Sequence, residues 1–134
     1  MSPYQEIEHT ADWALRVWAA TREALFVDAA EGMYALAGAR PAEAAAERLI
    51  VELHGEDYES LLAAWLQEWL YYTEMRQLVF DGFEIQRLTP GEVRGSANGR
   101  PAAHLDKLIK AVTYHNLRIE GKDGEYKVTI VFDV

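Results

Sequence analysis

The chain has 134 residues, contains no cysteine and carries a formal net charge of −9. A chain of this length is expected to form one domain over residues 1–134, and the absence of cysteine excludes disulfides, thiolate zinc sites and a cysteine nucleophile. The acidic charge argues against a stand-alone nucleic-acid binder, and the absence of a signal-type N-terminus or a long apolar run predicts a cytoplasmic protein with no membrane partner.

The first part of the chain predicts two short strands and a helix. Alternating apolar residues indicate strands at Tyr4–Glu8 and at residues 13–18. Thr21 is placed to cap a helix that runs to about Ala37, where Gly38 would end it.

A third strand and the strongest helix follow. Residues 49–53 alternate as a strand, and Asp57 is a candidate N-cap. Behind Asp57, apolar residues recur at steps of three and four, which predicts a helix with one wide apolar face. These residues are Tyr58, Leu61, Leu62, Trp65, Leu66, Trp69 and Leu70. We expect both tryptophans to pack in the core rather than to form a platform for a ligand, because both belong to this face.

The second half of the chain is predicted to be almost entirely strand. The expected strands are residues 78–88, 92–98, 107–120 and 125–133. Turns are expected at 89–91 and 121–124, and residues 99–106 form the one irregular stretch, with Gly99 and Pro101 as breakers. The predicted fold class is α+β with two layers, in which two helices pack on one face of a mostly antiparallel sheet.

Three acidic groups form a candidate site. If the last strand lies antiparallel beside the strand at 13–18, Asp133 and the carboxylate of Val134 come close to Asp12. Like charges about 4 Å apart repel by roughly 4 kcal/mol at an effective dielectric of about 20, so such a cluster would take up a proton, a basic partner or a metal. An all-oxygen site prefers calcium or magnesium to zinc. Alternatively, Asp12 only closes a turn through its own side chain.

Residues 109–116 are unusually polar for a strand. Period two places Lys110 with Val112 and Tyr114 on one face and His115 among aliphatic residues on the other. From spacing alone, we expect Lys110 to be a solvated edge residue and His115 to be a hydrogen-bonded core histidine. The sequence has no glycine-rich phosphate loop and no G-x-S-x-G motif, so a nucleophilic enzyme is not supported, and no basic-aromatic surface for nucleic acid is expected.

Four segments together resemble the archease family, in the family's own order. They are HTADWALRVWAATREALFVDAAEGMYAL, LLAAWLQEWLYYTE, IKAVTYHNLRIE and YKVTIVFDV. The resemblance implies an accessory protein, not an enzyme, that serves the GTP- and manganese-dependent RNA ligase joining 2′,3′-cyclic-phosphate and 5′-hydroxyl ends. Such a protein would promote guanylylation and multiple turnover of the ligase in tRNA splicing and RNA repair, and would meet RNA only through the ligase.

The resemblance also implies a metal site. The family's ligands correspond to Asp12, Asp133 and Val134, the last through a main-chain or terminal oxygen. The implied cofactor is a divalent ion, calcium first, with magnesium or manganese as alternatives.

Partner contacts are implied at other motif positions. Lys110 matches the lysine of the family's IKA motif, which makes it a candidate contact to the ligase or its nucleotide. His9 and His115 also match motif positions and join Lys110 as candidate contacts. Leu108 departs from the family, which carries an acidic residue there, and this departure puts any charged contact at that position in doubt.

Two other functions stay open. A metal-assisted phosphoesterase would use Asp12, Asp133 and His9 around a bound water and would hydrolyse phosphate esters on its own. A plain adaptor would use its ion only to fix the chain ends and would show a chelator-sensitive melting temperature. Residues 1–84 hold 16 of the 22 acidic and 5 of the 13 basic side chains, which suits either a basic partner or simple solubility.

Overall fold

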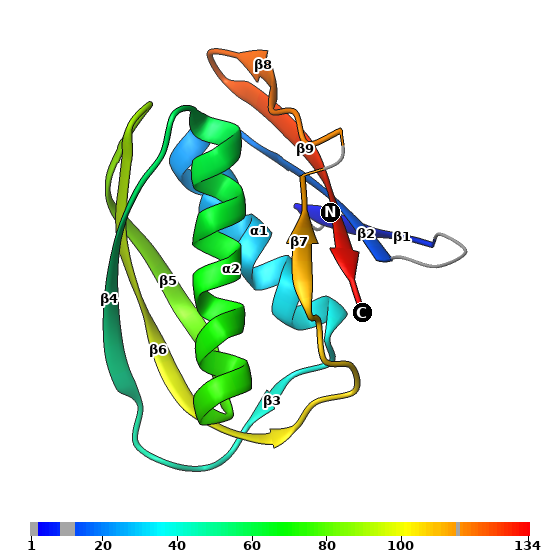
Figure 1. The fold of residues 1–134 in the computed structure, drawn as a ribbon, viewed down its shortest axis with the longest axis vertical. Helices are drawn as coiled ribbons and strands as arrows, with labels where there is room; N and C mark the ends of the chain where they lie inside the picture. Colours follow the sequence, from blue (N-terminus) through cyan, green and yellow to red (C-terminus); the bar gives the residue numbers. More distant parts are fainter. Residues whose placement is uncertain (1–2, 9–12, 115) are drawn as a thin grey trace.

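Two helices and two antiparallel sheets make up the chain, which this computed structural model describes for residues 3–8, 13–114 and 116–134. The helices are α1 (Arg22–Leu36) and α2 (Tyr58–Arg76). Figure 1 shows both helices between the sheets, and each helix contacts strands of both. The predicted α+β class is therefore confirmed, but the strands are divided between two sheets rather than forming one.

The first sheet contains the first and the last described strands. Its order is β1–β2–β9–β7, and β8 pairs with β9. The strands are β1 (Tyr4–Glu8), β2 (Trp13–Ala19), β7 (Ala111–Thr113), β8 (Glu120–Lys122) and β9 (Glu125–Asp133). β9 alternates as predicted, because its four core-facing side chains are buried and the residues between them are more exposed.

The second sheet is built around its longest strand, β6, which pairs antiparallel with β3, β4 and β5. The strands are β3 (Arg40–Pro41), β4 (Glu47–His54), β5 (Leu78–Thr89) and β6 (Glu92–His104). The turn predicted at 89–91 joins β5 to β6, so these two strands form a long hairpin.

Both helices begin at the residues that the sequence predicts. The N–H of Ala24 donates to the Thr21 hydroxyl at 3.0 Å, which caps α1. At α2, the N–H of Ser60 donates to the Asp57 carboxylate at 2.8 Å, and the N–H of Asp57 donates to the Ser60 hydroxyl at 3.2 Å. Within the described part of the chain, neither helix has the length and apolar character needed to cross a membrane.

The core joins α1 to α2 through buried aromatic side chains. Trp65 and Trp69 are fully buried, as predicted, and their rings meet edge to face at 5.2 Å. The Trp65 Nε1–H donates to the Phe26 carbonyl at 3.0 Å, and the hydroxyls of Tyr34 and Thr73 lie 2.7 Å apart. Burial raises the pKa of Tyr34, so its hydroxyl stays neutral and available as a donor. These bonds satisfy buried polar groups and fix the two helices against each other.

The prediction of one long strand over residues 107–120 is wrong. Among the described residues of this stretch, Ala111–Thr113 alone pairs with β9 before strand pairing resumes at Glu120. The N–H of Val112 donates to Gln67 Oε1 on α2 at 3.1 Å rather than to a neighbouring strand. Beyond Thr113 the chain turns, with a hydrogen bond from the N–H of Leu117 to the Tyr114 carbonyl at 3.2 Å. The predicted alternation of faces over residues 109–119 is therefore interrupted.

The stretch predicted to be irregular, 99–106, is strand as far as His104. Gly99 pairs with Phe80, and an added Cβ at Gly99 would lie 2.8 Å from the Phe80 ring, so glycine allows the close approach. Pro101 pairs with Leu78, the first residue of β5. Gly99 and Pro101, which the sequence analysis interprets as strand breakers, therefore lie within β6.

Replacing Gly95 by alanine is expected to lower the free energy of unfolding by about 1–3 kcal/mol, the range for overpacking a core. Its Cβ would lie 2.5 Å from Trp65 Cη2 and 2.6 Å from the Glu84 carbonyl oxygen, which belongs to rigid backbone. Gly91→Ala is the matched control, because its nearest neighbour lies 3.9 Å away. Urea unfolding measures both variants, and equal midpoints would show that the β5–β6 hairpin does not pack on Trp65 in this way.

Candidate metal and partner site

The end of β9 lies beside the start of β2. Phe132 is directly opposite Trp13 in the antiparallel register, so the strand neighbour on which the predicted acidic cluster depends is confirmed. Asp12, His9 and His115 lie outside the described residues. The described half of the candidate site therefore consists of Asp133, Val134 and their neighbours on β7 and β2.

Asp133 is held by its backbone while its carboxylate faces solvent. The N–H of Lys110 donates to the Asp133 carbonyl at 2.8 Å, and Ala111 pairs with Asp133 in the ladder between β7 and β9. The side chain of Asp133 is exposed, and it forms no hydrogen bond or ion pair with the residues described. The sheet thus fixes the backbone of Asp133, and its carboxylate is exposed.

The donors at this end of β9 fit a hard divalent cation. They are the carboxylate of Asp133 and the oxygens of Val134, which is half-buried and packs against the core. Carboxylate and carbonyl oxygens are the ligands that calcium and magnesium prefer. Two neighbouring donor residues are fewer than such an ion needs, so a full site requires a further ligand from another segment.

Two lysines flank the same end of β9. Lys110 is exposed, and its backbone is hydrogen-bonded to Asp133. Lys107 was not identified from the sequence: its ammonium lies 3.0 Å from the centroid of the Trp13 ring, which attaches the segment before β7 to the start of β2. No periodic signal could have found this contact, because the two residues are far apart in sequence and meet only through the β2–β9 pairing.

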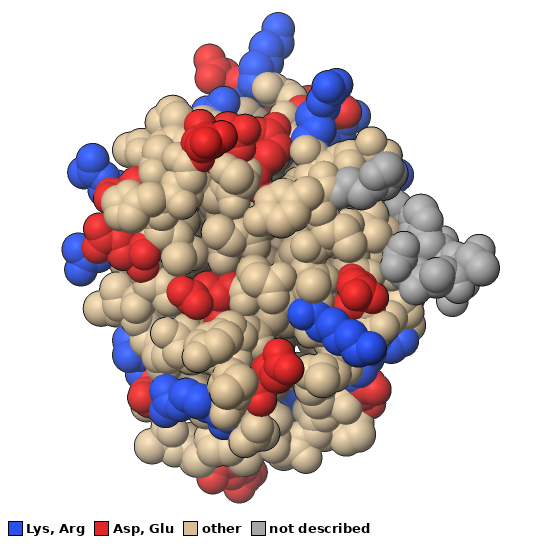
Figure 2. Space-filling view, viewed as in Figure 1, with Lys and Arg blue, Asp and Glu red and all other residues tan. Residues whose placement is uncertain are grey.

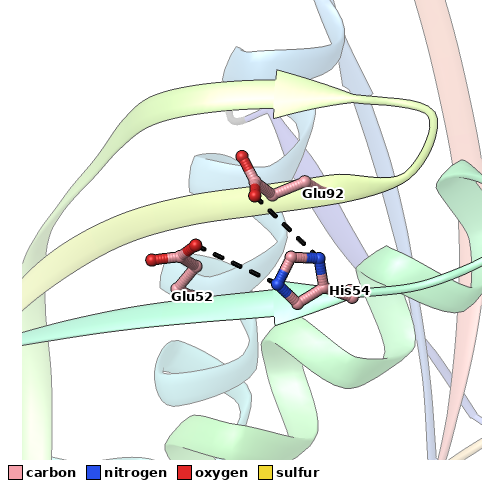
Figure 3. A group of neighbouring side chains, drawn as sticks. All are labelled: Glu52, His54 and Glu92. Carbon is pink, nitrogen blue, oxygen red and sulfur yellow. Dashed lines mark ion pairs between the residues drawn. The ribbon is translucent and has the colours of Figure 1, made fainter.

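A second group that could hold a metal ion lies on the other sheet. Glu52 and His54 are alternate residues of β4, and Glu92 of β6 is directly opposite His54 (Figure 3). Nε2 of His54 lies 3.9 Å from Glu52, and its Nδ1 lies 3.9 Å from Glu92. The sequence analysis did not identify this group, although alternate acid and histidine beside a hairpin turn are a usable signal.

An arginine already occupies part of that second group. Arg87 Nε lies 2.7 Å from Glu92 Oε1, and both Glu52 and His54 are exposed. A cation there would compete with the guanidinium for Glu92. The mixed nitrogen and oxygen donors would suit a transition metal better than calcium.

The face of the molecule that carries α2 has broad uncharged areas between scattered acidic and basic groups (Figure 2). Tyr71 and Met75 of α2 are 53% and 60% exposed, and Leu108 is 47% exposed. Leu108 also forms a wall of an open groove of about 370 Å³ beside the end of α2. Leu108 therefore adds apolar surface beside the end of α2.

Comparison with known proteins gives a consistent result over the whole chain. The sequence model of the Archease protein family (MTH1598/TM1083) matches residues 4–134. The chain is 39% identical to the protein archease of Methanopyrus kandleri over 141 residues, with 98% of this chain and 99% of the relative covered. Its fold matches the solution structure of Methanobacterium thermoautotrophicum protein 1598, with a TM-score of 0.75, 27% identity and full coverage of both chains. It also matches the crystal structure of a Thermotoga maritima protein described as an archease and possible chaperone, with a TM-score of 0.72, 24% identity and coverage of 97% and 96%.

Proposed function

The chain belongs to the archease family, and on that premise we propose that it is a cytoplasmic, metal-binding accessory protein of a GTP-dependent RNA ligase. In this proposal the protein catalyses no reaction by itself. It promotes guanylylation of the ligase that joins 2′,3′-cyclic-phosphate and 5′-hydroxyl RNA ends, and it keeps that ligase turning over in tRNA splicing and RNA repair.

The observation that carries the proposal is the meeting of β9, β2 and β7 at Asp133. The Phe132–Trp13 pairing and the hydrogen bond from Lys110 to Asp133 support the proposal, because they bring the backbones of Asp133 and Lys110 to the start of β2. The ladder between β7 and β9 holds the backbone of Asp133, so its side chain can be presented to a partner with little loss of entropy.

The cation of this proposal is divalent, calcium first, with magnesium or manganese as alternatives. Asp12, Asp133 and a main-chain or terminal oxygen of Val134 would hold it. When bound, the ion supplies positive charge that offsets the mutual repulsion of the carboxylates. Asp133 then serves to fix the end of β9 in one position for docking.

Lys110 is the residue that we propose to contact the ligase or its bound nucleotide. Its ammonium is exposed, and it forms no ion pair with any residue described. A fixed cation supplied from outside an active site can stabilise charge on a phosphoryl group during its transfer. His9 and His115, which lie outside the described residues, remain candidate contacts.

Lys110→Ala is expected to lower GTP-dependent labelling of the ligase at least about tenfold, since an electrostatic group supplied to phosphoryl transfer contributes on that scale or above. Labelling with radioactive GTP and purified ligase measures the effect. Lys122→Ala is the matched control, because Lys122 is an exposed lysine of β8 near the opposite end of β9. Equal labelling with both variants would remove Lys110 from the mechanism, and hydrolysis of phosphate esters by the purified protein alone would favour the phosphoesterase.

A further inference from the structure

A basic cavity on the outer face of the first sheet has no role in the proposed function. Arg16 of β2, Lys127 of β9 and Arg118 of the segment before β8 line this cavity, whose volume is about 460 Å³. The other lining residues are Asn116, Glu120, Val128 and Thr129. Three of the cations of an acidic chain therefore meet in one hollow.

Strand alternation and register assemble these residues. Leu15 and Val17 of β2 are buried against the helices, so Arg16 between them faces outward. Arg16 lies directly opposite Thr129 in the β2–β9 ladder. The β8–β9 pairing places Glu120 opposite Lys127, which brings the segment containing Arg118 to the same face.

The charges in the cavity favour an anion. Lys127 Nζ lies 3.8 Å from Glu120, but Arg16 and Arg118 form no ion pair with any part of the chain that the structure describes. Two exposed guanidinium groups beside a lysine repel one another unless an anion lies between them. A guanidinium binds phosphate oxygens in a bidentate manner, and the Thr129 hydroxyl and Asn116 amide add neutral donors.

An aromatic side chain adjoins the cations. A second cavity of about 410 Å³ shares Arg16 and Lys127 with the first and is also lined by Trp18, which is half-buried. Trp18 lies opposite Lys127 across the β2–β9 ladder. A positively charged groove beside an aromatic face is the arrangement that binds the phosphate and base of a nucleotide.

We propose that this outer face binds single-stranded RNA directly, with a phosphate between Arg16 and Arg118 and a base against Trp18. Two adjoining cavities along one strand suit consecutive nucleotides of a chain better than one compact nucleotide. The inference goes beyond the proposed function, which brings RNA to the protein only through the ligase. The sequence analysis expected no basic-aromatic surface for nucleic acid, and it missed this group because β2, β9 and the segment before β8 meet only in the fold.

The test measures RNA binding by this protein without any ligase, so its outcome is independent of the proposed function. The probe is a fluorescein-labelled single-stranded RNA of about 12 nucleotides, followed by fluorescence anisotropy at several salt concentrations. Arg16→Gln with Arg118→Gln is expected to raise Kd at least about tenfold and to reduce the salt slope by about 0.7, because the one phosphate held between the two arginines contributes about 0.7 on a single strand. Trp18→Leu is expected to weaken binding by about fivefold or more, while Trp18→Phe retains most of it.

The control variant removes the same number of arginines, and therefore the same positive charge, as Arg16→Gln with Arg118→Gln. Arg40→Gln with Arg94→Gln also removes two exposed arginines without a described ion-pair partner, but from the second sheet, and it should leave Kd close to that of the unsubstituted protein. Matching melting temperatures establish that all variants are folded. Equal loss of affinity in both double variants, or no RNA binding by the unsubstituted protein at low salt, would overturn the proposal. Displacement of the RNA by GMP at equal concentration would assign the cavities to a free nucleotide and would also overturn it.

Discussion

Asp133→Asn is expected to weaken calcium binding and, with it, stimulation of the RNA ligase, each by at least about tenfold, because it removes a charged oxygen ligand at nearly constant shape. The backbone of Asp133 is held by the N–H of Lys110 at 2.8 Å, and this bond does not involve the altered side chain. The variant should therefore fold normally. Isothermal titration with calcium and a ligation assay with limiting ligase measure the two effects on the same preparation.

Two further variants separate this result from nonspecific loss of charge. Asp123→Asn removes an exposed carboxylate from the turn between β8 and β9 and should change neither calcium affinity nor stimulation. His54→Gln alters the other group that could hold a metal. If His54→Gln abolished calcium binding while Asp133→Asn left it intact, the ion would belong to the β4–β6 hairpin and the assignment to Asp133 would be wrong.

Trp65→Ala is expected to lower the free energy of unfolding by about 3–5 kcal/mol, the range for truncating a buried tryptophan. Trp65 is fully buried, packs edge to face on Trp69 at 5.2 Å, and donates from Nε1 to the Phe26 carbonyl at 3.0 Å. The substitution leaves a cavity between the helices and the second sheet, and it leaves the Phe26 carbonyl without its side-chain donor.

Met75→Ala on the same helix is the control, because Met75 is 60% exposed and its loss should change stability by no more than about 0.5 kcal/mol. Urea unfolding at constant temperature measures both variants. A loss below about 1 kcal/mol for Trp65→Ala would mean that the tryptophan is not a central core residue, and a ligand platform would then replace core packing as the better interpretation.

Local signals in the sequence predicted the elements that depend on local contacts. Thr21 and Asp57 were identified as caps because a cap uses hydrogen bonds within one turn of the chain. The alternation of β9 and the apolar face of α2 were identified because each follows the geometry of a single element. The α+β class followed from the order of these elements.

The errors arose where distant contacts override the local pattern. Residues 107–120 have the composition of a strand. However, Gln67 of α2 accepts the hydrogen bond from the N–H of Val112, and the chain turns after Thr113. Gly99 and Pro101 look like breakers, yet Phe80 and Leu78 of β5 pair with them. Neither partner can be identified from the segment's own sequence.

The candidate site was only partly predictable for the same reason. The candidate acidic site required the last strand to lie beside the strand at 13–18, and the pairing of Phe132 with Trp13 confirms this condition. Nothing in the spacing of the residues required the pairing. The Lys107–Trp13 contact and the group at His54 depend on registers between strands and were missed. The roles proposed for Asp133 and Lys110 came from resemblance to a family, not from spacing.

Multiple-turnover ligation by the cognate ligase, with and without this protein, tests the central claim most directly. The reaction contains limiting ligase, GTP, manganese and an excess of RNA carrying 2′,3′-cyclic-phosphate and 5′-hydroxyl ends. The account predicts that the amount of joined RNA exceeds the amount of ligase many-fold only when this protein is present. The same yield with and without the protein, under conditions in which the ligase alone completes one turnover, would contradict it.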